Sequence, residues 1–130
     1  MKIAICASMS FERKVLAIGE ELEKLGHKVK MPFLTDKIIG KEKHDKLKVD
    51  RDLIRYYYQE IKKSDAVLIL NFDKNNIKNY IGGNTLMEIG FAYVLKKPIY
   101  LLNPIPKMTY SDEIFAMKPI ILNGDLSKIK

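Results

Sequence analysis

The stretch Ser64-Asp65-Ala66-Val67-Leu68-Ile69-Leu70-Asn71 decides the fold. Its five central residues, 66–70, are all apolar, and polar residues bound them on both sides. A strand with one face in water alternates apolar and polar residues, whereas a strand buried on both faces is apolar throughout. The stretch therefore predicts a central strand in a parallel sheet that helices cover on both sides.

The sequence around this strand alternates strand and helix patterns. Short apolar or alternating runs predict strands at residues 3–6, 29–33, 66–70, 99–102 and 120–122. Apolar residues at helical spacing predict helices at residues 11–25, 45–63, 85–95 and 111–117, with a polar loop at 35–44. Gly26 is placed to end the first helix. This alternation predicts a single flavodoxin-like or Rossmann-like α/β domain over residues 1–130, with a five-stranded, mostly parallel sheet of order 2-1-3-4-5.

The composition fits one globular domain in the cytoplasm. The 130 residues are 47% hydrophobic and 30% charged, which is typical of a chain that folds around its own core. No apolar run approaches the length that crosses a bilayer, and the first residues lack the pattern of a signal peptide. Cys6, which has no second cysteine to pair with, is expected to be an inert thiol in a buried strand.

The charge favours anionic partners without indicating a nucleic-acid interface. The net charge is +7, and 20 of the 23 basic residues are lysines. Base readout relies on arginine and on a clustered basic stripe, whereas these lysines are scattered among acids, so nucleic-acid binding is not expected. The two histidines are 17 positions apart and have no second cysteine beside them, so we expect no metal site.

Three segments are predicted to converge on a ligand site. Ligands of open parallel sheets bind beyond the carboxyl ends of the strands, where the strand order reverses. At that point lie the loop after the first strand, the loop after the third strand and the start of the next helix. Their candidate ligand-binding residues are Ser8, Met9, Ser10, Asn71, Gly82, Gly83, Asn84 and Thr85, with Asp73 close by. Ser8 has the alternative role of a helix cap, and Asn71 that of a strand cap.

Glu88 is the candidate catalytic residue. It lies about one turn into the helix that Asn84 or Thr85 is expected to cap. It is therefore within reach of a ligand at the switch point, the place where the strand order reverses. A carboxylate there can act as a nucleophile or a general base. The structural alternative is a capping box, because Thr85-x-x-Glu88 matches that pattern. Gly90, in the same helix, is expected to allow close packing against a strand.

The chain resembles the nucleoside 2-deoxyribosyltransferase family, whose superfamily includes the 2'-deoxynucleoside 5'-phosphate N-hydrolases. The resemblance rests on residues 64–71, on the stretch Tyr80-Ile81-Gly82-Gly83-Asn84-Thr85-Leu86-Met87-Glu88-Ile89-Gly90-Phe91-Ala92, and on residues 97–102. Residues 5–9 are similar to the family's first strand and loop. The resemblance implies a flavodoxin-like sheet, no metal or cofactor, and cleavage of the N-glycosidic bond of a deoxynucleoside or its monophosphate.

The resemblance also implies roles for single residues. Glu88 matches the family's nucleophile, which forms a covalent deoxyribosyl-enzyme and expels the base. The Ser8 loop and the helix amides would hold the 5' end of the ligand. The resemblance further implies a homo-oligomer, a dimer or larger, in which the segment Tyr110 to Met117 of a neighbour completes the site. The expected partner is thus a small-molecule nucleoside or nucleotide, and no membrane is involved.

The chain differs from the family pattern in three respects. Ala4 and Ile5 stand where an aromatic residue is usual, Tyr57 where an acid is usual, and Ser10 where the hydrolases have an arginine. Asp73 is the nearest acid before the glycine loop and is the candidate for protonating the departing base. These differences motivate an alternative function, a nucleotide-binding or sensor protein without turnover on the same scaffold.

Overall fold

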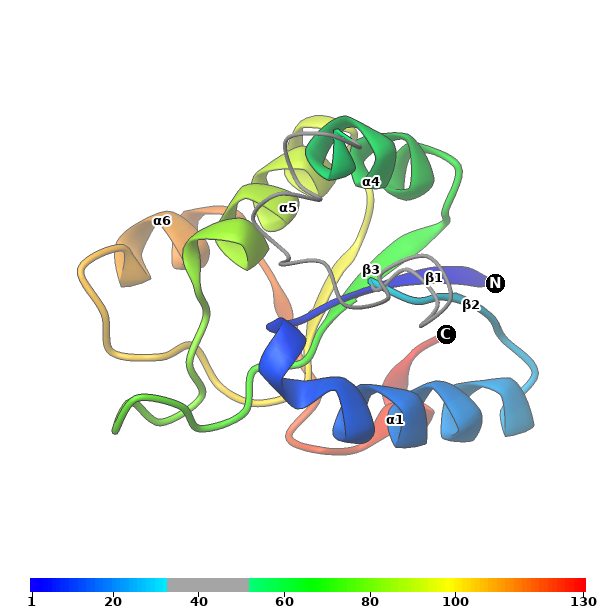
Figure 1. The fold of residues 1–130 in the computed structure, drawn as a ribbon, viewed down its shortest axis with the longest axis horizontal. Helices are drawn as coiled ribbons and strands as arrows, with labels where there is room; N and C mark the ends of the chain where they lie inside the picture. Colours follow the sequence, from blue (N-terminus) through cyan, green and yellow to red (C-terminus); the bar gives the residue numbers. More distant parts are fainter. Residues whose placement is uncertain (33–51) are drawn as a thin grey trace.

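The computed structural model describes residues 1–32 and 52–130 and contains one parallel sheet. Its strands, in spatial order, are β2 (Lys28–Lys30), β1 (Lys2–Cys6), β3 (Ala66–Ile69), β4 (Ile99–Leu101) and β5 (Ile120–Ile121) (Figure 1). Every neighbouring pair is parallel. The predicted sheet and its 2-1-3-4-5 order are therefore confirmed. The predicted loop 35–44, the start of the predicted helix 45–63 and Phe33 lie outside the described residues.

The helices follow the predicted order along the chain. They are η1 (Met9–Phe11), α1 (Glu12–Lys24), α4 (Leu53–Lys62), α5 (Gly83–Val94), α6 (Ser111–Ala116) and η2 (Leu126–Lys128). Helix α1 ends as predicted at Gly26, whose φ is +95°. The N–H of His27 there donates to the carbonyl of Leu22 at 3.1 Å, which closes the last turn. Glycine reaches a positive φ at little cost, so it is the usual residue at such an end.

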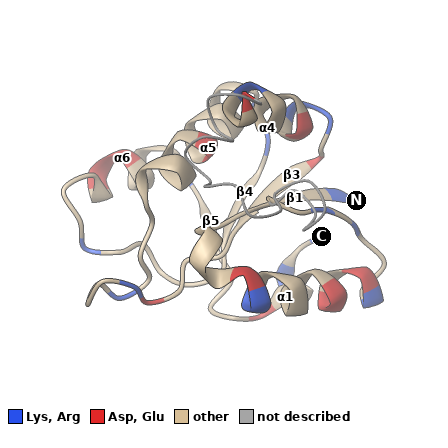
Figure 2. Ribbon diagram, viewed as in Figure 1, with Lys and Arg blue, Asp and Glu red and all other residues tan. Residues whose placement is uncertain are grey.

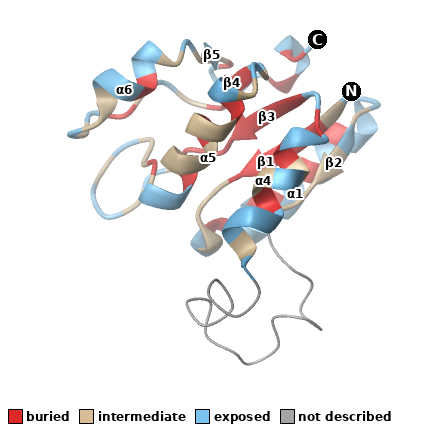
Figure 3. Ribbon diagram, turned by 90° about the horizontal axis from the view of Figure 1, so that it is seen from above, coloured by how far each residue is buried: buried red, intermediate tan, exposed pale blue. Residues whose placement is uncertain are grey.

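The sheet separates two apolar cores. Successive side chains of a strand point to opposite faces, so Ile3 and Ile5 of β1 join one core, while Ala4 and Cys6 join the other. Helix α1 and the C-terminal segment cover the first face, and α4, α5 and α6 cover the second (Figure 1). The central strands β1, β3 and β4 are mostly buried between the partly exposed helices, as Figure 3 shows, whereas the outer strands β2 and β5 are not. Residues 66–69 are buried on both faces, as their apolar run predicts.

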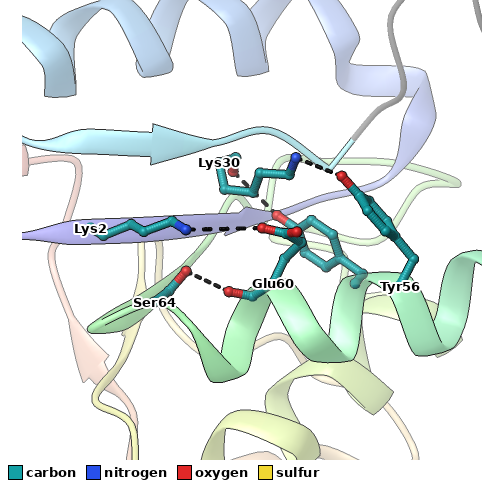
Figure 4. A network of polar contacts seen from close by, with 6 residues as sticks. Lys2, Lys30, Tyr56, Glu60 and Ser64 are labelled. Carbon is teal, nitrogen blue, oxygen red and sulfur yellow. Dashed lines mark hydrogen bonds and ion pairs between the residues drawn. The ribbon is translucent and has the colours of Figure 1, made fainter.

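Polar contacts fasten α4 to the edge of the sheet (Figure 4). The Nζ of Lys2 lies 4.0 Å from the carboxylate of Glu60, and the hydroxyl of Ser64 donates to the Glu60 carbonyl at 2.7 Å. The Nζ of Lys30 on β2 donates to the hydroxyl of Tyr56 at 2.7 Å. The contact of Lys30 with Tyr56 is exposed and contributes little stability, whereas Ser64 is buried and satisfies a carbonyl near the end of α4.

The surface carries both signs of charge. Acidic and basic side chains alternate along α1, which begins with Glu12 and ends with Lys24 (Figure 2). A nucleic-acid interface would instead show one sign of charge along a face. Within residues 1–32 and 52–130, none of the helices is long and apolar enough to cross a bilayer.

Candidate active site

The turn after β1 is built around Ser8. Its backbone is extended (φ −64°, ψ 141°), and its Oγ accepts a hydrogen bond from the N–H of Ser10 at 3.4 Å. The Oγ atoms of Ser8 and Ser10 are 2.9 Å apart. Ser8 thus caps η1, which confirms the helix-cap alternative, and Met9 and Ser10 form the first residues of that helix. Contact of these residues with a ligand stays a prediction.

Lys74 joins the turn after β1 to the loop after β3. Its Nζ donates to the Oγ of Ser8 at 2.8 Å and lies 5.6 Å from the centre of the Tyr80 ring. Its backbone pairs with Ile77 in an isolated antiparallel bridge, which shapes the loop. Lys74 was not among the residues predicted for the site. Its position in the sequence could have indicated a role, because it follows a predicted central strand by four residues. The loop after such a strand lies at the edge of the sheet where ligands bind.

Aromatic packing also holds these two loops together. The rings of Phe11 and Phe72 meet edge to face, with centroids 5.2 Å apart. The Nζ of Lys14 lies 4.7 Å from the centre of the Phe72 ring. The predicted convergence of the first two loops is therefore confirmed.

Asn71 connects the ends of β3 and β4. It is completely buried, and its Nδ2 donates to the carbonyls of Asn103 at 2.8 Å and Pro104 at 3.0 Å. Its Oδ1 accepts the N–H of Asn103 at 2.9 Å. Both N–H bonds of the side-chain amide are thus engaged within the protein. This arrangement corresponds to the strand-cap alternative, and a direct ligand contact would have to displace one of these bonds.

Asp73 lies at the same edge but is exposed. Its Oδ1 accepts the backbone N–H of Asn79 at 2.9 Å, and Asn79 has a positive φ of +59°. Asparagine tolerates this left-handed conformation better than most residues. The contact thus helps to close the loop, and the predicted catalytic role of Asp73 stays a prediction.

Helix α5 begins at Gly83, with Gly82 as its extended cap residue and no side-chain cap. The prediction that Asn84 or Thr85 caps this helix is therefore wrong. The helix starts earlier because the glycines let the backbone turn close to the Tyr80 ring, which would lie 3.2 Å from a Cβ on Gly82. Thr85 is buried, whereas Gly83 and Asn84 are exposed. The first-turn N–H groups of a helix lack intrahelical acceptors and attract anions.

Glu88 lies in the second turn of α5, half-buried, with its carboxylate against the thiol of Cys6. Burial raises the pKa of Cys6 well above its ordinary 9.0, and the charge and side-chain hydrogen bond of Glu88 raise it further. The thiol is therefore protonated at neutral pH and can donate to the carboxylate. The capping box predicted from Thr85-x-x-Glu88 does not form, because the helix begins two residues before Thr85.

Gly90 does not pack as expected. A Cβ at this position would meet no described atom within 4 Å, so the predicted close approach to a strand is wrong. The physical reason is that the buried residues of α5 are Thr85, Ile89 and Ala92, which direct a different side of the helix toward the core.

Tyr57 occupies the position where the resemblance leads one to expect an acid. Its buried hydroxyl donates to the carbonyl of Ile5, and the carbonyl of Lys30 lies 3.2 Å away. Burial raises the pKa of Tyr57 well above 10.0, and nearby Cys6 and Glu88 add to that shift. The hydroxyl thus ties α4 to β1 and β2 and remains neutral at physiological pH.

The segment Tyr110 to Met117 lies next to this chain's own glycine loop. The hydroxyl of Tyr110 donates to the carbonyl of Ile81, the residue before Gly82. Burial, together with neighbouring Tyr80, raises the pKa of Tyr110. The contribution of this segment to a neighbour's site stays a prediction.

A hollow of about 580 Å³ lies at the other edge of the sheet, at the amino ends of β4 and β5. Its lining combines apolar residues with three lysines: Tyr93, Val94, Lys96, Lys97, Pro98, Ile99, Met117, Lys118 and Ile120. The predicted chemistry lies at the carboxyl ends of the strands, so this hollow is not part of the candidate site. Among the described residues, no group of three or more His, Cys, Asp or Glu side chains is arranged to hold a metal ion.

The fold is similar to two solved enzyme structures. A 2-deoxyribosyltransferase from the psychrotolerant bacterium Bacillus psychrosaccharolyticus aligns with a TM-score of 0.60 and 21% sequence identity, over 80% of this chain and 73% of that chain. The flavoenzyme FerB, an NAD(P)H:acceptor oxidoreductase from Paracoccus denitrificans, aligns with a TM-score of 0.50 and 16% identity, over 92% of this chain and 74% of that chain. No protein-family model and no curated protein matches the sequence. Because these two enzymes carry out different chemistry, the likeness describes the fold alone.

Proposed function

We propose that this protein cleaves the N-glycosidic bond of a 2'-deoxynucleoside or its 5'-monophosphate, with Glu88 as the nucleophile. The observation that carries the proposal is the position of the Glu88 carboxylate. It lies at the switch point of the sheet, against Cys6 at the end of β1 and one turn beyond the exposed start of α5. The fold likeness to a 2-deoxyribosyltransferase supports the same class of reaction.

The proposed reaction has two displacements. In the first, a carboxylate oxygen of Glu88 bonds to C1' of the deoxyribose, while the C1'–N bond breaks and its electron pair leaves with the base. In the second, water or the nitrogen of another base attacks C1' and the ester bond breaks, which restores the carboxylate. The attacking water or base loses a proton in this step. Water gives hydrolysis, and a second base gives transfer.

Cys6 and Asp73 have supporting roles in this proposal. The protonated thiol of Cys6 holds the Glu88 carboxylate in place and cannot compete with it as a nucleophile, since the thiolate is the reactive form. Asp73 is the proposed proton donor to the departing base. It is exposed at the same edge of the sheet and can therefore exchange protons with solvent.

The test is base release from a panel of ribo- and deoxynucleosides and their monophosphates, with and without a free second base, followed by chromatography. We expect Glu88→Gln to lower the rate at least about a thousandfold while the melting temperature changes little. Glu20→Gln, at an exposed position on α1, is the matched control and should retain the full rate. Mass spectrometry of the trapped enzyme should find the added deoxyribosyl group on the peptide that contains Glu88.

Two results would contradict this proposal. Full activity of Glu88→Gln on a confirmed substrate would show that another group is the nucleophile. Nucleotide binding by the wild-type protein without any base release over hours would favour the alternative function, a sensor without turnover.

A further inference from the structure

The hollow at the amino ends of β4 and β5 is lined largely by apolar side chains. Ile99 is buried and Met117 is half-buried. The other large apolar side chains, Tyr93, Val94 and Ile120, are 45%, 79% and 48% exposed. Single exposed apolar residues are ordinary, whereas a group of them around a cavity marks a place where a ligand or partner binds. The volume of about 580 Å³ is within the range of roughly 300–1,000 Å³ that is usual for small-molecule pockets.

Three lysines share this hollow with the apolar side chains. They are Lys96, Lys97 and Lys118, and the described residues that line the hollow include no acid. The ion pairs found in the described part of the chain involve other residues, so none of them neutralises these lysines. The hollow therefore combines an apolar lining with positive charge.

Lys96 and Lys118 reach the hollow through similar turns. Each follows the end of a helix, α5 and α6 respectively, and their φ angles are +60° and +56°. The N–H of Lys96 donates to the carbonyl of Tyr93 at 3.0 Å. The N–H of Lys118 donates to the carbonyl of Phe115 at 3.1 Å. Glycine is the usual residue in this conformation, yet at both positions the chain carries a lysine that lines the hollow.

The carboxyl ends of α5 and α6 reduce the positive charge without cancelling it. A helix end carries at most about half a negative charge, so the two ends together offset about one of the three ammonium charges. A net positive charge therefore remains beside the apolar side chains.

This combination favours an occupant that is both apolar and negatively charged. A second copy of this chain that docked through the same surface would bring its own lysines against these, and like charges across an interface repel. Strand addition by another protein is poorly suited as well, because β5 is only two residues long. A small organic anion with an apolar body matches both the lysines and the apolar side chains.

We infer that this hollow binds small amphipathic anions, molecules with an aromatic or aliphatic body and one anionic head group. The body packs against Tyr93, Val94 and Ile120, and the head group lies among the lysines. Lys97 contributes most to binding the head group, because it is half-buried and charges interact more strongly where water is partly excluded. The N–H of Lys97 donates to the carbonyl of Ala92 at 2.9 Å, which fixes its backbone beside the hollow.

The test uses two fluorescent probes that share an aromatic body, anilinonaphthalene sulfonate and the neutral N-phenylnaphthylamine. We expect the folded protein to bind the sulfonate at least about tenfold more tightly, and added salt to weaken the binding of the sulfonate alone. Lys97→Gln should weaken sulfonate binding at least about fivefold and leave binding of the neutral probe unchanged. Val94→Ser should weaken the binding of both probes, because it removes apolar contact from an exposed position.

Two variants on α1 are the matched controls. Lys24→Gln replaces an exposed lysine at a helix end, and Leu16→Ser replaces an apolar side chain that is 46% exposed. Both should bind the two probes like the wild type. Because loosely packed chains also bind such probes, a thermal melt of each variant accompanies its titration and shows that the folded form is measured.

The outcomes separate this inference from the proposed function. Equal binding of the two probes, absence of binding, or equal effects of Val94→Ser and Leu16→Ser would each overturn the inference. Glu88→Gln should bind both probes like the wild type, because Glu88 and the hollow lie at opposite edges of the sheet. A protein that releases no base can therefore still bind the sulfonate as expected.

Discussion

Asn71 and Asn103 bond to each other in both directions across the carboxyl ends of β3 and β4. The Asn71 amide binds the backbone of Asn103, and the Nδ2 of Asn103 donates to the Asn71 carbonyl at 3.0 Å. Together they hold the loops of two neighbouring strands at a fixed separation, immediately beside the candidate site. The floor of that site is therefore braced by side chains that a ligand would not need to move.

Alanine substitutions at these two positions should lower the free energy of unfolding by different amounts. Asn71→Ala leaves a buried N–H and two carbonyls without their partner, so we expect the free energy of unfolding to fall by roughly 2–3 kcal/mol. Asn103→Ala removes one side-chain bond and should cost about 1 kcal/mol. Urea unfolding of both variants and of the double variant measures the coupling. Equal effects of the two single variants would contradict the observed arrangement.

Cys6 and Tyr57 predict a loss of stability at high pH. Burial raises the pKa of both groups above 9.0 and 10.0, so the folded protein keeps protons that the unfolded chain releases. Their contribution to stability is complete below pH about 9 and declines above it, by at most about 1.4 kcal/mol per pH unit for each group.

Urea unfolding at pH 7.5, 9 and 10 measures this decline, and Cys6→Ala is the comparison. This variant should show a shallower decrease of the unfolding free energy between pH 9 and 10 than the wild type. Identical slopes for the two proteins would mean that the thiol does not titrate differently on unfolding.

Asp73→Asn separates a catalytic role from a structural one. An amide oxygen can still accept the N–H of Asn79, so we expect the melting temperature to stay unchanged. If the carboxyl protonates the departing base, the rate of base release should fall by about a hundredfold. An unchanged rate would remove Asp73 from the mechanism.

Alanine substitutions at two helical glycines should have different effects on stability. At Gly90 a Cβ meets no described atom within 4 Å, so Gly90→Ala should raise the free energy of unfolding by about 1 kcal/mol. At Gly19 a Cβ would lie 2.1 Å from the terminal methyl of Met31, so that side chain must move. We therefore expect Gly19→Ala to gain nothing or to destabilise the protein. Thermal melts of the two variants check this difference.

The fold followed from the sequence because its signals are local and redundant. The apolar run at residues 66–70 indicates a strand buried on both faces, and Gly26 stops a helix whose apolar spacing is regular. The predicted start of α5 was wrong by two or three residues, since the observed cap is Gly82. A glycine cap has no side-chain signature, whereas Thr85 and Glu88 together imitate a capping box.

The candidate site was only partly predictable, because its side chains come from distant parts of the chain. Strand order placed Ser8 and Glu88 at one edge of the sheet. Nothing in the sequence indicates that Lys74 reaches Ser8, 66 positions away, or that both N–H bonds of Asn71 are engaged within the protein. Such pairings depend on the conformation of a loop, which periodicity does not encode.

The two edge strands of the described sheet are poorly suited to pairing with a second molecule. The outer strands β2 and β5 are three and two residues long, and β2 begins and ends with lysine. Short outer strands offer few unpaired amides to a second molecule, and the lysines of β2 add charge at that border, so growth by strand addition is disfavoured. We therefore expect that concentrated solutions of the folded protein do not form fibrils.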